Sequence, residues 1–462
     1  MTETVATSAL AEELGPQLRG DVIGREDPRY DDARKVYNGM IDKRPLAIAQ
    51  CRDQADVIAA VKFGAKQGLD VAVRGAGHNG AGLGTVDDGL VIDLSPMRWT
   101  RVDAAARTVT AGGGSQLGDI DHAAGGFGLA VPVGILSTTG IGLALGGGVG
   151  YLSRKYGLTI DNILSADVVL ADGSAVRASE DENEDLFWAI RGGGGNFGVV
   201  TSLTLRAYEQ PTMIWGPTFW PLERSAEILS WYREFLPAQA DDLNGFFAFL
   251  TVPPGPPFPE ELHKKKMCGV VWSFTGDPAD ADEALKPVRE TEPVLDAVMA
   301  VPVSAANAAF DELYPAGDQW YWRGDYFAQI PDEAVALHAE FGEQLPTWKS
   351  TMHLYPSDGA ASRVAEDATP WAYRESKWTA VYAGVDPDPA NAEAIRKWTV
   401  AYQEALHPYS MGGSYINFIG TEEGQDRVQA TYGSNYERLA KIKAKYDPDN
   451  FFHVNQNIRP AS

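Results

Sequence analysis

One glycine-rich octapeptide constrains this chain more than any other feature. It reads Val73-Arg-Gly-Ala-Gly-His-Asn-Gly80 and follows the apolar run 69–73, which predicts a strand. Two glycines in such a turn let the backbone approach a phosphate with its N–H groups exposed, and Arg74 adds a positive charge beside them. His78 places an imidazole at the mouth of the loop. The octapeptide therefore predicts a nucleotide-binding turn at the end of a strand.

Three further segments make this interpretation specific, because a single glycine motif recurs by chance in a glycine-rich chain. They are 134–150, 192–200 and 455–458. The first alternates glycines with small hydroxyl and apolar residues, so it can line a flat ligand closely. The alternative for His78 is a loop histidine bonded to a neighbouring carbonyl. The alternative for Ser137, Thr138 and Thr139 is ordinary turn chemistry.

The composition limits the partners that the chain can have. With 462 residues it is long enough for two or three domains. A net charge of −24 disfavours broad binding to nucleic acid or to anionic membranes. No apolar run approaches the ~20 residues that span a bilayer. Residues 1–19 lack the basic start and apolar stretch of a secretory signal, so we expect a cytoplasmic protein.

The two cysteines argue against a disulfide framework or a zinc site. Cys51 and Cys268 lie far apart, form no CxxC pair and fall in apolar surroundings. We expect both to be buried as small hydrophobic side chains, and we predict no metal site.

Residues 45–206 predict an α+β domain. Residues 53–66 place apolar side chains on one helical face, with Asp53 as N-cap and a stop at Gly68. Strands are predicted at 69–73, 90–94 and 108–111, and a hairpin at 167–178.

The composition changes after Arg206, where glycine becomes rarer and aromatic residues and proline increase. Strand-like runs occur at 246–251, 268–275 and 378–383, and helix-like runs at 225–235, 332–342 and 391–406. Strands interleaved with long helices predict an antiparallel sheet covered by helices on one face. We interpret this region as a second domain.

Six motifs follow one another along nearly the whole chain. They are the lead-in 30–51, Arg74-Gly-Ala-Gly-His78, Leu143-Ala-Leu-Gly-Gly-Gly148, Tyr156-Gly-Leu-Thr-Ile-Asp-Asn162, Arg191-Gly-Gly-Gly-Gly-Asn-Phe-Gly198 and 446–458. Together they resemble the FAD-linked oxidases of the vanillyl-alcohol oxidase superfamily and, more narrowly, the berberine bridge enzyme-like branch.

This resemblance implies an α+β fold with two domains. A two-part, PCMH-type FAD-binding domain would cover 1–207, with its core at about 40–207, and a substrate domain would cover 208–417. The segment 418–462 would return to the FAD domain. The flavin would lie at the junction of the two domains.

The resemblance also implies a covalent flavin. In this family the histidine that matches His78 bonds to the 8α-methyl group of FAD. Many members add a second bond through a cysteine, but the matching position here is Leu136. We therefore predict a single histidyl link.

The cofactor-binding residues expected from these motifs form four groups. They are Arg74, Gly75, Ala76, Gly77, His78, Asn79 and Gly82; Gly134, Ser137, Thr138, Thr139, Gly140, Gly142, Gly146, Gly147, Gly148 and Gly150; Gly198 and Val200; Asn455 and Asn457.

The expected catalytic residues are a tyrosine and a histidine with aromatic neighbours. The resemblance makes Tyr415, in Tyr-Ile-Asn-Phe418, the first candidate for the group that handles the substrate proton. His353 and Tyr355 share one face of a predicted strand, and His353 has the more suitable ordinary pKa. The alternative for His353 is an edge strand that faces water. Where some members carry a glutamate base, this chain has Thr379.

Three aromatic residues complete the expected site. Tyr382 is expected to line the pocket, and Tyr151 to supply an aromatic wall. Trp322 could do the same, although we expect it to pack in the core.

The resemblance implies an oxidase that transfers hydride from a small alcohol, amine, sugar or phenolic metabolite to FAD, with O2 reduced to H2O2. A dehydrogenase that uses another acceptor is the alternative, and residues such as Thr139 and Leu143 against the flavin would decide between them. A flavin-binding protein without catalysis is the third interpretation.

Overall fold

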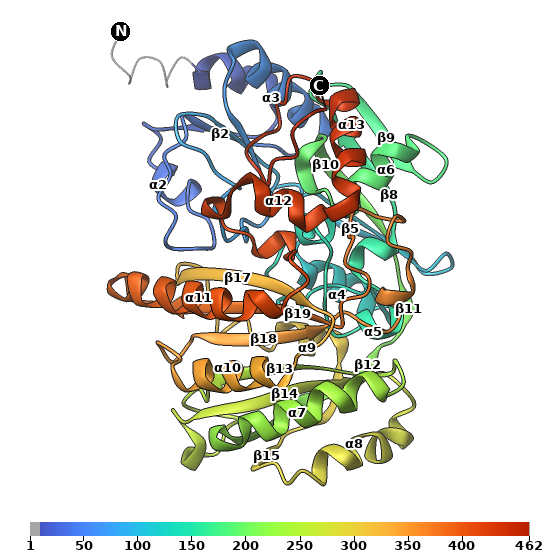
Figure 1. Cartoon of the computed structure of the whole chain (residues 1–462). Helices are drawn as coiled ribbons and strands as arrows, with labels where there is room; N and C mark the ends of the chain where they lie inside the picture. Colours follow the sequence, from blue (N-terminus) through green and yellow to red (C-terminus); the bar gives the residue numbers. More distant parts are fainter. Residues whose placement is uncertain (1–9, 462) are drawn as a thin grey trace.

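The first half of the chain folds around two sheets in a computed structural model that describes residues 10–461 (Figure 1). Residues 1–9, which belong to the predicted 1–207 domain, lie outside the described range. The four-stranded sheet has the order β1-β2-β4-β3, and its β2, β4 and β3 are parallel. Its strands are β1 (Val22–Gly24), β2 (Ala47–Gln50), β3 (Val71–Arg74) and β4 (Leu90–Asp93).

The second sheet of this half is antiparallel and has the order β5-β6-β10-β8-β9. Its strands are β5 (Thr100–Asp103), β6 (Thr108–Gly112), β8 (Ile163–Val169), β9 (Ala175–Ser179) and β10 (Val199–Arg206). The predicted hairpin is confirmed as β8–β9. Helices α2 (Tyr30–Ala33), α3 (Gln54–Gln67), α4 (Leu117–Gly125), α5 (Ser153–Tyr156) and α6 (Glu184–Ile190) belong to this half.

Helix α3 packs against both sheets, and its N-cap and its C-terminal end lie at the residues that the sequence predicts. The Asp53 carboxylate caps its first turn by accepting from the Asp56 N–H, and Gly68 ends it with φ of 64°. Its buried face packs on strands of both sheets, where Cys51 is also buried.

The second half is built on an eight-stranded antiparallel sheet with the order β15-β12-β14-β13-β18-β19-β17, and β16 also pairs with β12. Its strands are β12 (Thr212–Pro221), β13 (Leu243–Thr251), β14 (Lys266–Phe274), β15 (Leu295–Asp296), β16 (Met299–Pro302), β17 (Gln319–Phe327), β18 (Thr351–Pro356) and β19 (Trp378–Asp386). A short antiparallel pair joins β7 (Leu129–Ala130) of the first half to β11 (Tyr208–Glu209), which directly precedes the second half.

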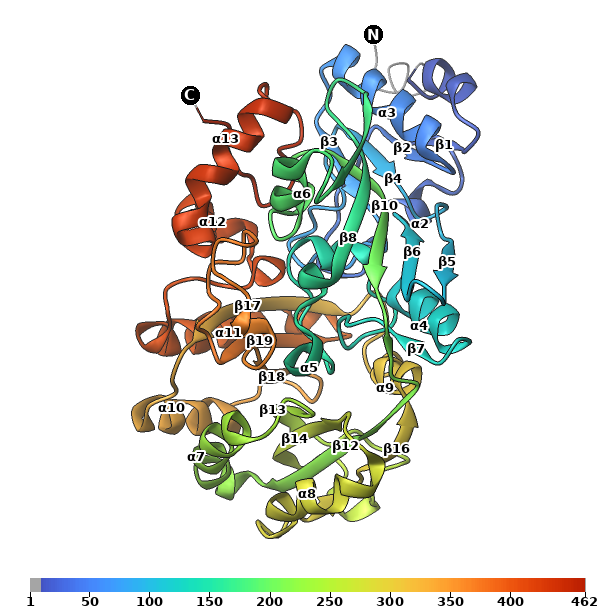
Figure 2. The same cartoon turned by 90° about the vertical axis from the view of Figure 1, so that its right-hand side faces the viewer.

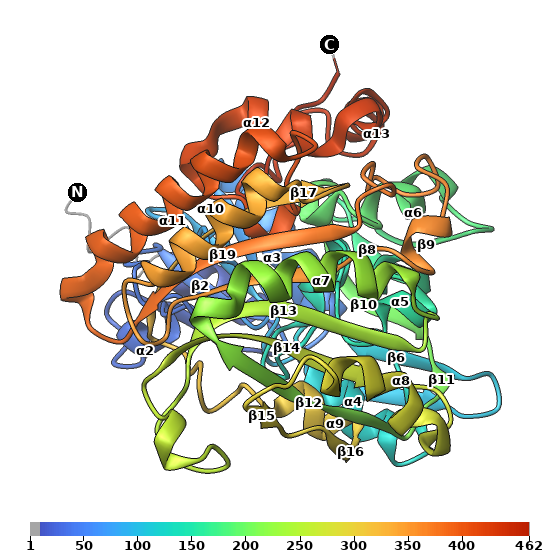
Figure 3. The ribbon, with the colours of Figure 1, turned by 60° about the horizontal axis from the view of Figure 1, so that its bottom comes forward.

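Helices α7 (Ser225–Phe235), α8 (Ala281–Arg289), α10 (Asp332–Glu343) and α11 (Ala392–Leu406) pack on one face of this sheet (Figure 3). Side chains alternate along each strand, so Met352 and Leu354 of β18 face these helices while His353 and Tyr355 face the first half. Cys268 is buried on the helix side. The α+β fold and this layer of helices are confirmed. Helix α9 (Val303–Ala308) also belongs to this half.

The C-terminal segment returns to the first half through α12 (Gly424–Tyr432) and α13 (Tyr436–Tyr446), and α13 packs beside α6 (Figures 1 and 2). The buried Lys443 ammonium anchors it by donating to the Asp447 carboxylate and to the carbonyls of Asn196 and Phe452. Within residues 10–461 we find no helix with the length and apolar character needed to cross a membrane.

Candidate active site

A cavity of about 400 Å³ lies between the glycine-rich loops of the first half and the helix-free face of the eight-stranded sheet. The first wall consists of backbone and small side chains from residues 74–79, 134–146 and 193–198. The opposite wall consists of side chains from β17, β18 and β19. The cavity therefore has one wall rich in backbone and one wall rich in side chains.

The loop after β3 contributes most of the first wall. Arg74, Gly75, Ala76, Gly77, His78 and Asn79 all line the cavity. The Arg74 guanidinium is not a free charge, because it donates to the buried Asp93 carboxylate at 2.8 Å and to the Lys35 carbonyl at 3.3 Å. Its role in the fold is to hold the loop against β4. The positive charge of Arg74, which the sequence placed beside a phosphate, is therefore balanced by a carboxylate within the protein.

His78 is held at the mouth of the loop by a neighbouring ring and by a carbonyl. Its imidazole stacks on Tyr37 with 3.8 Å between ring centroids, and it hydrogen-bonds to the Thr138 backbone. Burial lowers the pKa of His78 to about 4, so the ring is neutral near pH 7. A neutral imidazole has a free nitrogen lone pair.

The end of this loop is structural. The Asn79 side-chain oxygen accepts from the Leu83 N–H at 3.1 Å. Gly82 has a φ of 69° and packs on Ile41, and it does not line the cavity.

The segment 134–150 divides into residues that line the cavity and residues that support it. Gly134, Thr139, Gly140, Gly142 and Gly146 line it. Ser137 does not, since its backbone N–H and hydroxyl both donate to Asp311. Thr138 contributes its backbone to His78.

Gly147, Gly148 and Gly150 lie outside the cavity lining for a packing reason. A Cβ at Gly147 would meet the Trp371 and Tyr415 rings, at Gly148 the Thr159 side chain, and at Gly150 the Val133 carbonyl. These glycines let other parts of the chain approach closely, rather than the expected ligand.

The two remaining segments meet at Asn196. Its side-chain amide donates to the carbonyls of Gly193 and Gln456 and accepts from the Ile458 N–H at 2.8 Å. Gly198, Val200 and Asn455 line the cavity as expected, whereas Asn457 does not. Five further residues of these two segments line the cavity and were not among the predicted cofactor-binding residues: Gly193, Gly194, Gly195, Asn196 and Gln456.

The first wall fits a flat cofactor at three glycines. Gly142, Gly194 and Gly195 line the cavity, and a Cβ at any of them would meet no atom within 4 Å. The buried Asn455 Oδ1 has no hydrogen-bond partner in residues 10–461. Open backbone and an unsatisfied polar atom at one wall are what an FAD-sized ligand with polar edges requires.

His353 and Tyr355 form a hydrogen-bonded pair at the centre of the opposite wall. His353 Nδ1 lies 2.6 Å from the Tyr355 hydroxyl. Strand β18 lies between β13 and β19, so the alternative of an edge strand facing water is wrong. Burial lowers the pKa of His353 to about 3 and raises that of Tyr355. The pair is therefore uncharged near pH 7.

Tyr415 lies in the segment before the 3-10 helix Ile416–Phe418 and not on the sheet. Its phenol oxygen accepts from the Gly148 N–H and from Asn417 Nδ2, both at 2.7 Å. Burial raises its pKa to about 12, although both hydrogen bonds act in the opposite direction. The resting group is therefore a phenol.

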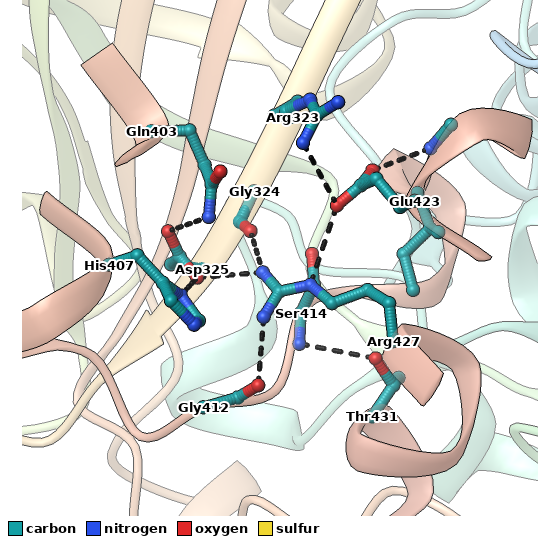
Figure 4. Close-up of polar contacts among 12 residues, drawn as sticks. Arg323, Gly324, Asp325, Gln403, His407, Gly412, Ser414, Glu423, Arg427 and Thr431 are labelled. Atoms are coloured by element: carbon teal, nitrogen blue, oxygen red, sulfur yellow. Dashed lines mark hydrogen bonds and ion pairs between the residues drawn. The ribbon is translucent and has the colours of Figure 1, made fainter. Parts of the chain in front are cut away.

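A buried network fixes the segment that carries Tyr415 (Figure 4). The Arg427 guanidinium donates to the carbonyls of Gly412 and Gly324 at 2.8 Å and to the Asp325 carboxylate at 2.7 Å. Asp325 is fully buried on β17 and also binds Gln403 and His407. Arg427 therefore ties the two ends of segment 412–427 to the sheet.

Two expected pocket residues lie elsewhere. Tyr382 is fully buried and packs on Tyr402 of α11, because only the alternate residues Val381 and Ala383 of β19 face the cavity. Tyr151 packs behind the wall, against Trp215 and Phe246.

Several aromatic residues of the cavity were not predicted. Trp322 lines it rather than packing only in the core, and the rings of Tyr37, Phe310, Tyr314, Trp320 and Phe418 also line it, beside the amide of Asn417. Among these residues, only Trp320 and Trp322 could have been recognised from the sequence, because their spacing of two places both side chains on one face of a strand. The others come from loops that only the fold brings together.

Comparison with known proteins agrees with this architecture. Residues 45–179 match the FAD binding domain family, and residues 414–459 match the berberine and berberine like family. The (R)-6-hydroxynicotine oxidase of Paenarthrobacter nicotinovorans is 31% identical over 470 residues, covering 96% of this chain and 97% of that protein. The chain belongs to the berberine-like FAD-linked oxidoreductases.

Other relatives of this oxidoreductase support the same family. An FAD-linked oxidoreductase of Dictyostelium discoideum is 29% identical, with 98% and 97% of the two chains covered. The structure of 6-hydroxy-D-nicotine oxidase from Arthrobacter nicotinovorans superposes with a TM-score of 0.85 at 28% identity, covering 96% and 98%. Xylooligosaccharide oxidase from Myceliophthora thermophila, at 23% identity, shares the fold with a TM-score of 0.84 over 99% and 100%. The protein is therefore an FAD-dependent enzyme.

Proposed function

We propose that this oxidoreductase oxidises a small organic molecule at a carbon that bears a hydroxyl or amino group, with O2 as the final acceptor and H2O2 as product. One observation carries the proposal. A single cavity has an uncharged histidine beside glycine-rich loops on one wall and a second uncharged histidine on the other. When bound, FAD supplies the hydride acceptor. The enzyme must then hold the substrate and remove its proton.

We further propose that His78 forms the only covalent bond to FAD. Its ring is neutral, stacked and held by a backbone contact, so it can present a nitrogen lone pair in a fixed direction. Leu136, at the position of the second link in many relatives, carries no nucleophile. Cys51 and Cys268 are both buried outside the cavity lining.

On the other wall, His353 is the group that accepts the substrate proton. In the tautomer that this role requires, Nδ1 donates to the Tyr355 oxygen 2.6 Å away and Nε2 accepts the substrate proton. A base with a lowered pKa suffices, because an alcohol O–H becomes far more acidic as hydride leaves the adjacent carbon. Tyr415, which is a phenol at rest, donates a hydrogen bond to the substrate heteroatom.

Acid precipitation of the purified enzyme tests the covalent link. We expect a yellow pellet and an intact mass raised by one FAD, and for His78→Ala a colourless pellet with FAD in the supernatant. His122→Ala, at an exposed position of α4, is the control and should stay yellow. A yellow pellet from His78→Ala would refute the assignment. Comparing turnover with O2 and with an artificial electron acceptor then tests oxidase against dehydrogenase action.

A further inference from the structure

The scarcity of charged side chains in the cavity lining indicates which substrates the cavity can bind. This inference rests on the proposed function. Arg74 is the only Asp, Glu, Lys or Arg among the described residues that line the cavity. Its charge is balanced by Asp93, and it lies on the glycine-loop wall. The substrate-facing wall therefore offers no countercharge.

The polar groups on the substrate-facing wall are neutral. The His353–Tyr355 pair shares a hydrogen bond of 2.6 Å, and Tyr415 is hydrogen-bonded to Asn417 at 2.7 Å. Thr351, the other polar side chain of β18 in the lining, donates to the Phe249 carbonyl at 2.7 Å and is used within the protein. What remains for a ligand is a small set of uncharged donors and acceptors.

The rest of this wall is aromatic. Trp320 lies 5.7 Å from Tyr37 and 5.5 Å from Trp322, and Trp322 lies 6.1 Å from Phe418, measured between ring centroids. Trp320 is 8% exposed, and its Nε1–H has no acceptor among the described residues. A flat ligand with one neutral acceptor would find stacking partners and a donor here.

From this composition we infer that the substrate is an uncharged aromatic alcohol, and not an ammonium ion, a carboxylate or a polyhydroxylated sugar. An ion would enter a cavity wall that cannot pair with it, and removing an unpaired charge from water is costly. That cost exceeds what stacking on an aromatic ring gains. A sugar would bury many hydroxyls against rings that cannot satisfy them.

Titration calorimetry on the flavin-loaded enzyme tests this inference with ligands of nearly one shape: benzyl alcohol, benzylamine and benzoate, with glucose as a neutral polyol. We expect benzyl alcohol to bind at least about tenfold more tightly than each of the others. Equal or tighter binding of benzylamine, benzoate or glucose would overturn the inference, as would failure of benzyl alcohol to bind.

Three variants test whether the substrate-facing wall causes the preference for the alcohol. His353→Gln keeps the wall neutral and should keep the preference for the alcohol. His353→Glu supplies a carboxylate and should narrow the gap between benzylamine and benzyl alcohol by at least about tenfold. Leu354→Met, the next residue on β18 but on the helix side, is the control and should leave the ratio unchanged. A ratio in His353→Glu equal to that of the unmodified enzyme would contradict the role given to the wall.

The same ligands separate this inference from the proposed function. Anaerobic loss of the yellow flavin absorbance reports hydride transfer, whereas calorimetry reports binding alone. Selective binding of benzyl alcohol without loss of absorbance would refute the proposed oxidation and leave the neutral-ligand preference standing. Loss of absorbance with benzylamine but not with benzyl alcohol would support the proposed oxidation and refute the inference that the substrate is an uncharged aromatic alcohol.

Discussion

The imidazole of His78 stacks on the phenol ring of Tyr37 at 3.8 Å, with 20° between the ring planes. The Tyr37 hydroxyl donates to the Tyr314 carbonyl at 2.7 Å, so this ring is fixed to the second half of the chain. The residue proposed to hold FAD is thus oriented by a contact that spans both halves of the molecule.

Removing this stack should weaken flavin attachment. When Tyr37→Leu apoenzyme is mixed with FAD, we expect the covalent bond to form about two- to tenfold more slowly than in the unmodified enzyme. The reason is that an aromatic pair contributes about 0.5–1.5 kcal/mol. Tyr37→Phe keeps the ring and should attach flavin at nearly the normal rate. In-gel flavin fluorescence after denaturation measures both, and equal rates in Tyr37→Leu would show that the stack has no orienting role.

Replacing Tyr415 by Phe should reduce turnover more than substrate binding. The change removes a hydrogen-bond donor to the substrate and leaves the Gly148 N–H without its acceptor. An unsatisfied buried donor should lower the free energy of unfolding by about 1–3 kcal/mol. Steady-state kcat and KM, together with denaturant unfolding, test the two effects. An unchanged kcat would leave His353 as the only proton-handling group of this wall.

Arg427 should stabilise the protein and support turnover from a distance. In Arg427→Met the buried Asp325 keeps His407 and Gln403 but loses its strongest cation, and breaking a buried ion pair costs about 3–5 kcal/mol. We expect a lower midpoint of denaturant unfolding and a lower kcat, because the segment with Tyr415 and Asn417 loses its tie to β17. Gln429→Met, exposed on the same helix, is the control. A normal midpoint in Arg427→Met would mean that the network adds no stability.

A buried histidine should make stability depend on pH. Burial lowers the pKa of His338 to about 3, whereas in the unfolded chain it is about 6.5. Between these values the unfolded state binds more protons, so the free energy of unfolding should fall as the pH drops below about 6.5. His78 and His353 act in the same direction.

Replacing His338 tests this pH dependence away from the cavity. His338→Gln can still hydrogen-bond to Tyr402, as His338 does at 2.7 Å. Melting temperatures between pH 7 and 4.5 should fall less steeply in His338→Gln than in His122→Gln, whose side chain is exposed. Identical slopes would show that His338 is not titrated in this way.

Local chemistry in the sequence determined much of this protein. The cap at Asp53, the stop at Gly68 and the alternation in β18 are set by neighbouring residues, so the helix, the hairpin and the shared face of His353 and Tyr355 could be predicted. The ordered glycine motifs likewise predicted the family, since a backbone that must approach a ligand or another segment tolerates few other residues.

Only the tertiary structure decided which of those motif residues face the cavity. Gly147 and Gly148 have the same local pattern as Gly142, but Tyr415 and Thr159 occupy the space beside them. Pairing in the sheet turned Tyr382 toward α11 and placed β18 between two other strands. The stack of His78 on Tyr37 and the neutral state of His353 depend on contacts and burial between segments far apart in sequence, and no local pattern encodes those.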